Sequence, residues 1–347
     1  MAILMCRDIP VYDIKKDEVL SEVLCPFTDV LNSAKAYKTW RTNRAYLKTN
    51  RIAEQTVKQA GGFHTREAKR RLSLSDSFWI KHDYDSEIKF DDITPYLNPF
   101  SEAYIVKKEH SSSSVPELVL GGSQPKKWGV LSEPHYGVTT FMSKIEYPEQ
   151  VHAEMLAVKL AKACNIPAMN AFVEINERKV FAKEYHLFTP SCGVINLINM
   201  TSTERTLIQF DQLGIGVSGY NPTNIIEAYK KAGVSGDVTK TAIAQIIFDG
   251  VIGNIDRKTN NSNWAIFSDT QTGKRTPSHL YDFNWANLEN ANTIPIKEIV
   301  SNIKKSDVLQ IKSEALSILK IIADKTKELG LELWRENALN FETLLKP

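Results

Sequence analysis

Two aspartates and two asparagines lie close together in the second half of the chain, in an order suited to phosphoryl transfer. Asp256 is followed five and seven residues later by Asn261 and Asn263, and an apolar stretch then leads to Asp282. Phosphoryl transfer needs an aspartate that orients the attacking hydroxyl, and Mg²⁺ prefers oxygen ligands. The pattern predicts that Asp256 orients the hydroxyl and that Asp282 and an asparagine hold Mg²⁺. Taken singly, each residue also fits a turn cap or a polar loop.

A glycine-rich segment upstream offers a place for the phosphates of a nucleotide. Gly122, Ser123, Gln124 and Lys126 lie between two short runs that have the pattern of strands. Backbone N–H groups of such a loop can bind phosphate oxygens. We therefore predict that these four residues bind ATP.

Four further residues complete the predicted ATP site. Lys144 ends an extended run, from where it can reach the α- and β-phosphates. Glu154, in the first turns of the helix that follows, is placed to form an ion pair with that lysine. Glu184 and Tyr185 end another extended run, which we expect to lead into the hinge along adenine. ATP and Mg²⁺ are therefore the predicted cofactors.

The pattern of helices and strands around these residues divides the chain into three segments. Residues 1–95 are mixed in pattern and rich in lysine and arginine between residues 34 and 72. This basic stretch is either the solvated face of a helix or a surface for RNA or an acidic protein. Residues 96–188 contain short extended runs around one helix at 148–164, and residues 189–347 are mostly helical. The predicted fold class is α+β, with a small β-rich lobe followed by a mainly helical lobe.

These motifs, in this order, resemble those of the HipA-like serine/threonine kinases over residues 115–290. The matching stretches are the phosphate loop 122–126, the strand 139–144, the helix 152–157, the catalytic loop 253–257 and the metal segment 281–283. The resemblance implies a two-lobed protein-kinase-like fold and a cytoplasmic, ATP- and Mg²⁺-dependent serine/threonine kinase with toxin-like activity. It also implies a protein substrate, such as a protein of the translation machinery or the chain's own loop, and an antitoxin-like regulator.

The chain departs from the pattern of this family at two points. Lys258 stands where the family usually has histidine, which leaves reduced activity open. The metal asparagine is ambiguous, because Asn261 keeps the family's five-residue spacing whereas Asn263 keeps its Asn-Trp pair. The Asn-Trp pair favours Asn263, and both residues stay candidates. The alternatives to a protein kinase are a kinase-like module that binds nucleotide or a partner without transfer, and a small-molecule kinase.

A serine run precedes the predicted phosphate loop. Residues 111–114 are all serine, and Ser123 lies inside the loop itself. The resemblance implies that autophosphorylation there would repel the phosphates of ATP and inhibit the kinase. A plain flexible linker is the alternative, since serine runs are common in linkers.

Two other short motifs match known sites, but the sequence around them does not fit those sites. Gly214, Gly216 and Gly219 match the spacing of a dinucleotide-binding loop, but Pro222 prevents a helix from starting among the glycines. The His152-x-Glu154 pair resembles half of a zinc deaminase site, but the partner cysteine motif is absent. We expect a glycine-rich loop in the first case and a histidine on a helix surface in the second.

Composition limits the remaining classes of protein. The net charge of +2 argues neither for nor against nucleic-acid binding, so RNA stays a weak candidate partner. The four cysteines contain no C-x-x-C pair, which favours reduced thiols over a disulfide framework or a zinc site. No apolar stretch approaches the length of a membrane span. The sequence therefore predicts a soluble, cytoplasmic protein that does not bind a membrane.

Overall fold

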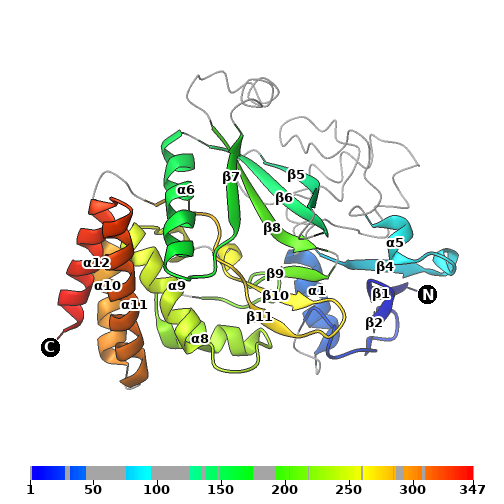
Figure 1. The fold of residues 1–347 in the computed structure, drawn as a ribbon. Coiled ribbons are helices and arrows are strands. Elements are labelled where there is room, and N and C mark those ends of the chain that lie inside the picture. The colour runs from blue at the N-terminus through cyan, green and yellow to red at the C-terminus, as the bar shows by residue number, and fades with distance from the viewer. Residues whose placement is uncertain are drawn as a thin grey trace.

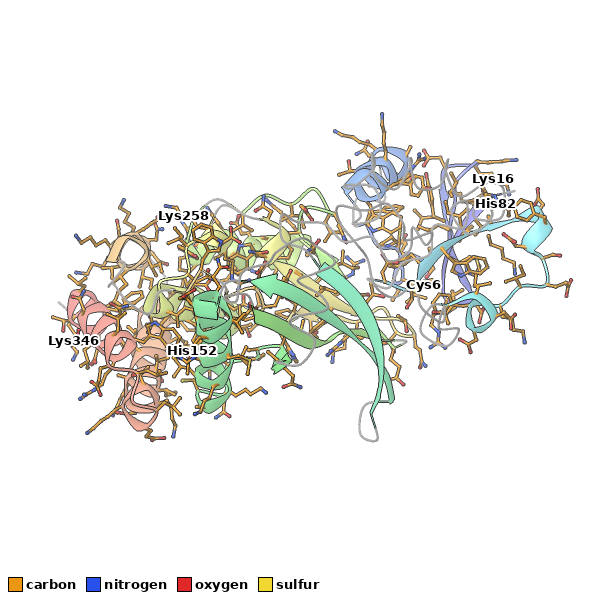
Figure 2. The ribbon with its side chains drawn as sticks, turned by 90° about the horizontal axis from the view of Figure 1, so that it is seen from above. Cys6, Lys16, His82, His152, Lys258 and Lys346 are labelled. Atoms are coloured by element: carbon orange, nitrogen blue, oxygen red, sulfur yellow. The ribbon has the colours of Figure 1, made fainter. Side chains whose placement is uncertain are left out.

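The computed structural model describes the chain in thirteen stretches, which are residues 2–27, 32–43, 76–94, 126–133, 137–146, 148–174, 193–202, 204–217, 219–258, 261–283, 285–286, 293–306 and 309–346. In these stretches the chain forms three antiparallel sheets and a group of C-terminal helices (Figure 1). Figure 2 shows the N-terminal sheet, marked by Cys6, Lys16 and His82, at the opposite end of the molecule from Lys346. This mixed architecture confirms the α+β class.

The first sheet is built from the N-terminal segment and is buried on both faces. Its strands are β1 (Ala2–Cys6), β2 (Ile9–Asp13), β3 (Glu18–Val19) and β4 (Phe78–His82), in the order β3-β2-β1-β4. Because side chains alternate along a strand, Leu4 and Cys6 of β1 join the main core, whereas Ile3 and Met5 pack with Trp79 on the other face. The segment also contains helices α1 (Ser33–Asn43), η1 (Asp83–Asp85) and α5 (Phe90–Ile93).

The second sheet carries the predicted ATP lysines. Its strands are β5 (Lys126–Glu133), β6 (Gly137–Glu146), β7 (Asn170–Glu174) and β8 (Gly193–Ser202), in the order β5-β6-β8-β7. Helix α6 (Pro148–Ala163) follows β6 and starts with a proline, which suits the first helical position because its missing N–H would have no partner there. The helix expected at 148–164 is thus confirmed as α6, and the extended runs expected at 127–131, 137–144 and 169–175 correspond to β5, β6 and β7. The extended runs expected at 117–120 and 179–185 lie outside the described residues. Residues 193–202, expected in the helical lobe, pair with β6 and β7 in this sheet.

The third sheet and five helices form the C-terminal part. The strands are β9 (Arg205–Gln209), β10 (Ala265–Asp269) and β11 (Arg275–Pro277), with β10 in the centre. The helices are α8 (Pro222–Lys231), α9 (Thr239–Ile252), α10 (Thr293–Lys305), α11 (Leu309–Glu328) and α12 (Glu332–Leu345). Helix α9 is buried continuously over its last three turns, and the other four helices pack around it. This arrangement fixes the end of α9, from which the candidate site begins.

The N-terminal segment packs directly on the third sheet. The guanidinium of Arg275 on β11 donates to the carbonyl of Cys25 and, at 2.8 Å, to the carbonyl of Ala232. The backbone N–H of Ser77 donates to Thr206 Oγ1 of β9 at 3.3 Å. Apolar side chains of both parts belong to one continuous core. The segment whose role the sequence left open is therefore part of the same folded body as the C-terminal helices.

Candidate nucleotide and metal site

The predicted catalytic loop starts where α9 ends. Gly253 caps α9 with φ of +73°, a left-handed conformation that glycine adopts without steric cost. The chain then forms two single 3-10 turns, η3 (Asp256–Lys258) and η4 (Asn261–Asn263), before it enters β10. The buried helix on one side and the buried strand on the other hold this loop between two rigid elements.

Asp256 and Asn263 are in direct contact. Asn263 Nδ2 donates to Asp256 Oδ2 at 2.6 Å, and Asn263 is buried whereas Asp256 is half-buried. With its amide nitrogen on Asp256, Asn263 has its amide oxygen as the atom that could ligate a cation. Asn261 behaves differently, because its Oδ1 accepts the backbone N–H of Val217 at 2.9 Å. The structure brings Asn263 to the predicted catalytic aspartate and uses Asn261 to hold a neighbouring loop.

The buried side chain of Arg257 connects α9, the loop that carries Asn263 and the segment before Asp282. Its side chain is 1% exposed, and its Nε donates to Asp249 Oδ2 of α9 at 2.8 Å. Its two terminal nitrogens donate to the carbonyl of Asn263 and, at 2.7 Å, to the carbonyl of Tyr281. The indole N–H of Trp264 donates to the Arg257 carbonyl at 2.9 Å. One buried guanidinium thus fixes the turn that carries Asp256, the backbone of Asn263 and the segment before Asp282.

The charge of Arg257 is balanced within the core. Burial alone would lower the pKa of Arg257, but the Asp249 carboxylate in direct contact, together with Tyr220 and Tyr281, more than offsets burial and raises the pKa, so the guanidinium stays charged. The second oxygen of Asp249 accepts Asn254 Nδ2 at 3.1 Å. Removal of one partner from such a buried pair leaves an uncompensated charge in the core. The sequence analysis did not assign Asp249 or Arg257 a role, although an aspartate inside a long apolar helix signals a buried partner.

Asp282 has a strained backbone between two buried aromatic residues. Its φ is +64°, in the left-handed region that non-glycine residues rarely adopt. Tyr281 and Phe283 are buried, whereas Asp282 is half-buried. The ring centroids of Phe283 and Phe248 of α9 lie 5.7 Å apart. The aromatic neighbours are held in the core, and they fix the strained, half-buried Asp282 between them. Such strain persists where the surroundings impose it, and it clusters at functional sites.

The segment of Asp282 is tied to the end of α6. The N–H of Met169 donates to the carbonyl of Leu280, and the N–H of Leu280 donates to the carbonyl of Pro167, both at 2.8 Å. These two bonds form a parallel bridge between the chain that leads into β7 and the chain that leads to Asp282. Helix α6 and the metal segment are therefore linked through the backbone.

The structure describes only part of the predicted ATP site. Glu154 is completely buried on α6. Lys144 of β6 lies opposite Lys126 of β5 in the strand register, so the two lysine backbones are neighbours. The predicted Lys144–Glu154 ion pair stays a prediction. The remaining predicted ATP and regulatory residues lie outside the described residues, and they are Gly122, Ser123, Gln124, Glu184, Tyr185 and the serines 111–114.

The glycine-rich segment and His152 lie where the sequence predicts, in a loop and on a helix surface. Helix α8 starts at Pro222 with Asn221 as its N-cap, after the glycine-rich loop and not within it. His152 is exposed on α6 (Figure 2). Within the described stretches no three His, Cys, Asp or Glu side chains gather as a metal site. The predicted Mg²⁺ ligands are the carboxylate of Asp282 and the amide oxygen of an asparagine, so they fall outside that pattern.

Lys258, the residue that departs from the family pattern, has a definite partner. Its Nζ lies 2.5 Å from Glu298 Oε2 on α10, and both side chains are about one-third exposed, at 36% and 27%. The residue therefore forms an ion pair at the surface of the turn that carries Asp256. Sequence spacing gave no sign of this partner, because the two residues lie 40 positions apart.

Comparisons with known proteins leave the family open. No family model matches the chain, and no curated protein matches its sequence. Among solved structures, the chain is similar to the Helicobacter pylori proinflammatory kinase CtkA, with a TM-score of 0.40 and 11% identity over 62% of this chain and 89% of that one. A likeness this low does not carry a functional argument. No helix in the described part has both the length and the apolar character of a membrane span.

Proposed function

We propose that the chain is an ATP- and Mg²⁺-dependent phosphotransferase that phosphorylates serine or threonine residues of a protein. The observation that carries the proposal is the hydrogen bond between Asp256 and Asn263, together with the buried Arg257, which donates to the carbonyl of Asn263 and to the carbonyl of Tyr281 next to the strained Asp282. The resemblance of the ordered motifs to HipA-like kinases supports the same reading. A toxin-like role and an antitoxin-like regulator belong to the proposal through that resemblance alone.

Each residue of the proposed site has a role that its chemistry allows. Asp256 accepts a hydrogen bond from the acceptor hydroxyl and takes its proton as the γ-phosphoryl group is transferred. Asn263 Oδ1 and the Asp282 carboxylate supply oxygen ligands, which suit a hard cation such as Mg²⁺. Mg²⁺, when bound, would neutralise charge on the phosphates. The hydrogen bond from Asn263 also keeps the Asp256 carboxylate in one orientation.

The upstream residues are proposed to bind the nucleotide. Lys144, on the strand next to β5, would pair with the phosphates and be held by Glu154. The phosphate loop at Gly122–Lys126 and the hinge at Glu184 and Tyr185 would cover the phosphates and the base. These assignments rest on the sequence motifs, and the backbone register of Lys126 and Lys144 is compatible with them.

Labelled ATP and Mg²⁺ test the proposal directly. Wild-type protein and Asp256→Asn would each be incubated with labelled ATP, Mg²⁺ and a mixture of protein acceptors, and phosphosites would be located by mass spectrometry. The asparagine keeps the shape of the side chain and removes the base, so transfer should fall by about 100-fold or more. Binding of nucleotide without transfer by the wild type would instead support the kinase-like binding module. Transfer to metabolites but not to proteins would support a small-molecule kinase.

A further inference from the structure

Glu298 on α10 contacts two loops with its two carboxylate oxygens. Oε2 lies 2.5 Å from Lys258 Nζ in the catalytic turn, and Oε1 accepts the backbone N–H of Tyr220 at 3.3 Å. Gly219 makes room for this contact, because a Cβ atom at that position would lie 2.7 Å from Oε1. The carboxylate therefore joins α10, the catalytic turn and the loop before α8.

The loop before α8 holds the catalytic turn at a second point. The buried hydroxyl of Tyr220 donates to the carbonyl of Asn254 at 2.5 Å, and the Tyr220 carbonyl accepts Asn302 Nδ2 of α10 at 3.0 Å. Burial raises the pKa of Tyr220, so the hydroxyl keeps its proton and remains a donor. Tyr220 is thus anchored to α10 and to the chain just before Asp256. Its backbone N–H therefore holds one oxygen of the Glu298 carboxylate in a fixed position.

The catalytic turn needs support on its exposed side. η3 is a single 3-10 turn, which has few internal hydrogen bonds of its own. Arg257 fixes the buried side of this turn through Asp249. Within the described chain, the ion pair of Lys258 with Glu298 is the contact from α10 that meets the exposed side, on the same turn as Asp256.

We infer that Glu298 is a positioning residue for Asp256, acting through the ion pair that it forms with Lys258. The inference rests on the proposed function, since it assigns Glu298 to the same site. The substitution of lysine for the family's usual histidine is then paired with a carboxylate on α10 that keeps the turn in place. Misplacement of a reacting group by about 1 Å can cost about 100-fold in rate.

The test compares single and double variants by their turnover. Glu298→Gln can still accept the Tyr220 N–H but loses the charge that holds Lys258. It should lower kcat about tenfold or more while KM for ATP stays within about twofold of the wild type. Lys258→Met should have the same effect, and the double variant should be no slower than either single one, since the two residues act as a unit.

A matched control removes an ion pair of similar geometry elsewhere. Glu342→Gln on α12 breaks the pair with Lys346, whose atoms lie 2.7 Å apart, and should leave kcat unchanged. Amide hydrogen exchange gives a readout that needs no activity. Exchange in residues 253–264 should become faster in Glu298→Gln and not in Glu342→Gln, with equal melting temperatures.

The outcomes separate the inference from the proposed function. Faster exchange in a chain that transfers no phosphate would support the contact of Glu298 with Lys258 as the support of this turn and would reject the proposed kinase activity. Transfer by the wild type with unchanged kcat and exchange in Glu298→Gln would overturn the inference alone. Faster turnover in Glu298→Gln would also overturn it, because Glu298 would then restrain Lys258. Exchange that rises throughout the chain, with a lower melting temperature, would show a general structural role and reject positioning.

Discussion

Asp282 combines a carboxylate side chain with a left-handed backbone. Substitutions at this one residue can therefore distinguish an effect on activity from an effect on stability. With φ of +64°, the residue has a conformation that only glycine adopts without steric cost. An aspartate that adopts this unfavourable backbone conformation indicates that its side chain is needed there. Glycine removes both the side chain and the backbone strain, whereas alanine removes the side chain and keeps the strain, so the two substitutions separate these effects.

Asp282→Gly should therefore lose Mg²⁺-dependent ATP turnover while the free energy of unfolding stays equal to the wild type or rises by up to about 1 kcal/mol. Asp282→Ala should lose the same turnover and be less stable than Asp282→Gly by about 1 kcal/mol, because alanine keeps the strain. Urea unfolding and ATP turnover measure both effects. Turnover that survives in folded Asp282→Gly would remove Asp282 from the site.

The two asparagines of the loop should separate in a second measurement. Asn263→Ala removes the contact with Asp256 and the proposed ligand, and should raise the Mg²⁺ concentration for half-maximal turnover about tenfold or more. Asn261→Ala removes the hydrogen bond from Val217 and should cost about 1 kcal/mol of stability with little change in the Mg²⁺ titration. The reverse pattern would assign the metal to Asn261.

At the scale of elements, the buried end of α9 and the turn that follows act as one unit. Arg257 is bonded to α9, to η4 and to the segment of Asp282, so a change in this side chain reaches three elements. The exposed ion pair of Arg335 with Glu332, at 3.1 Å, lies within α12 and does not join elements. The two kinds of pair should respond very differently to substitution.

Arg257→Leu should lower the free energy of unfolding by about 3–5 kcal/mol, because the buried Asp249 loses its charge partner in the core. Arg335→Leu, the exposed control, should cost less than about 1 kcal/mol. The double variant Arg257→Leu with Asp249→Leu should recover much of the stability but not the turnover, since the carbonyls of Asn263 and Tyr281 would still lack their donor. Equal losses in Arg257→Leu and Arg335→Leu would contradict the assigned role of the buried pair.

The predicted contact between β6 and α6 has a test of its own. Lys144→Met and Glu154→Gln should each reduce turnover about as much as the double variant does, because residues that act as a unit are not additive. Nucleotide binding, followed by calorimetry, should weaken in all three variants. Losses that simply add would show that Lys144 and Glu154 act separately.

At the scale of the whole molecule, the N-terminal segment closes on the hairpin between β10 and β11. Gly273 in that hairpin has φ of +68°, and a Cβ atom there would lie 2.2 Å from the carbonyl oxygen of Val23. Gly236 has a similar φ of +88°, and a Cβ atom there would meet nothing within 4 Å. An alanine at either position would have the same unfavourable backbone conformation. Only at Gly273 would the added Cβ atom also meet the N-terminal segment, at Val23.

Gly273→Ala should therefore be less stable than Gly236→Ala by about 1–3 kcal/mol, the cost of forcing extra volume into a packed contact. Thermal unfolding of the two variants measures the difference. Equal stability would mean that the N-terminal segment does not pack on this hairpin in solution.

The buried cysteines report on the same packing by their reactivity. Burial raises the pKa of the thiols of Cys6, Cys25 and Cys164 to about 12, so little thiolate exists at neutral pH. These three should react slowly with iodoacetamide in the native protein and quickly in denaturant, as peptide mass spectrometry would show. Rapid native labelling of Cys6 or Cys25 would indicate that the N-terminal segment opens.

Local sequence pattern accounts for most of the helices and strands and for the order of the site motifs. Helices α8, α9, α11 and α12 and strands β5 to β7 follow from apolar spacing and from the prolines and glycines that bound them, which act over a few residues. The spacing from Asp256 to Asn263 and the position of Asp282 could be found in the same way, because they lie within short stretches of chain.

The contacts between distant segments could not be predicted from the sequence and are seen only in the folded chain. Strand β9 pairs with β10 across more than fifty residues, β8 joins the sheet of the predicted ATP lobe, and the N-terminal segment packs on β11. The choice of Asn263 as the neighbour of Asp256 and the pairing of Lys258 with Glu298 were decided in the same way. Local pattern cannot determine such contacts, because they depend on long-range burial and on the satisfaction of buried polar groups, which only the assembled core imposes.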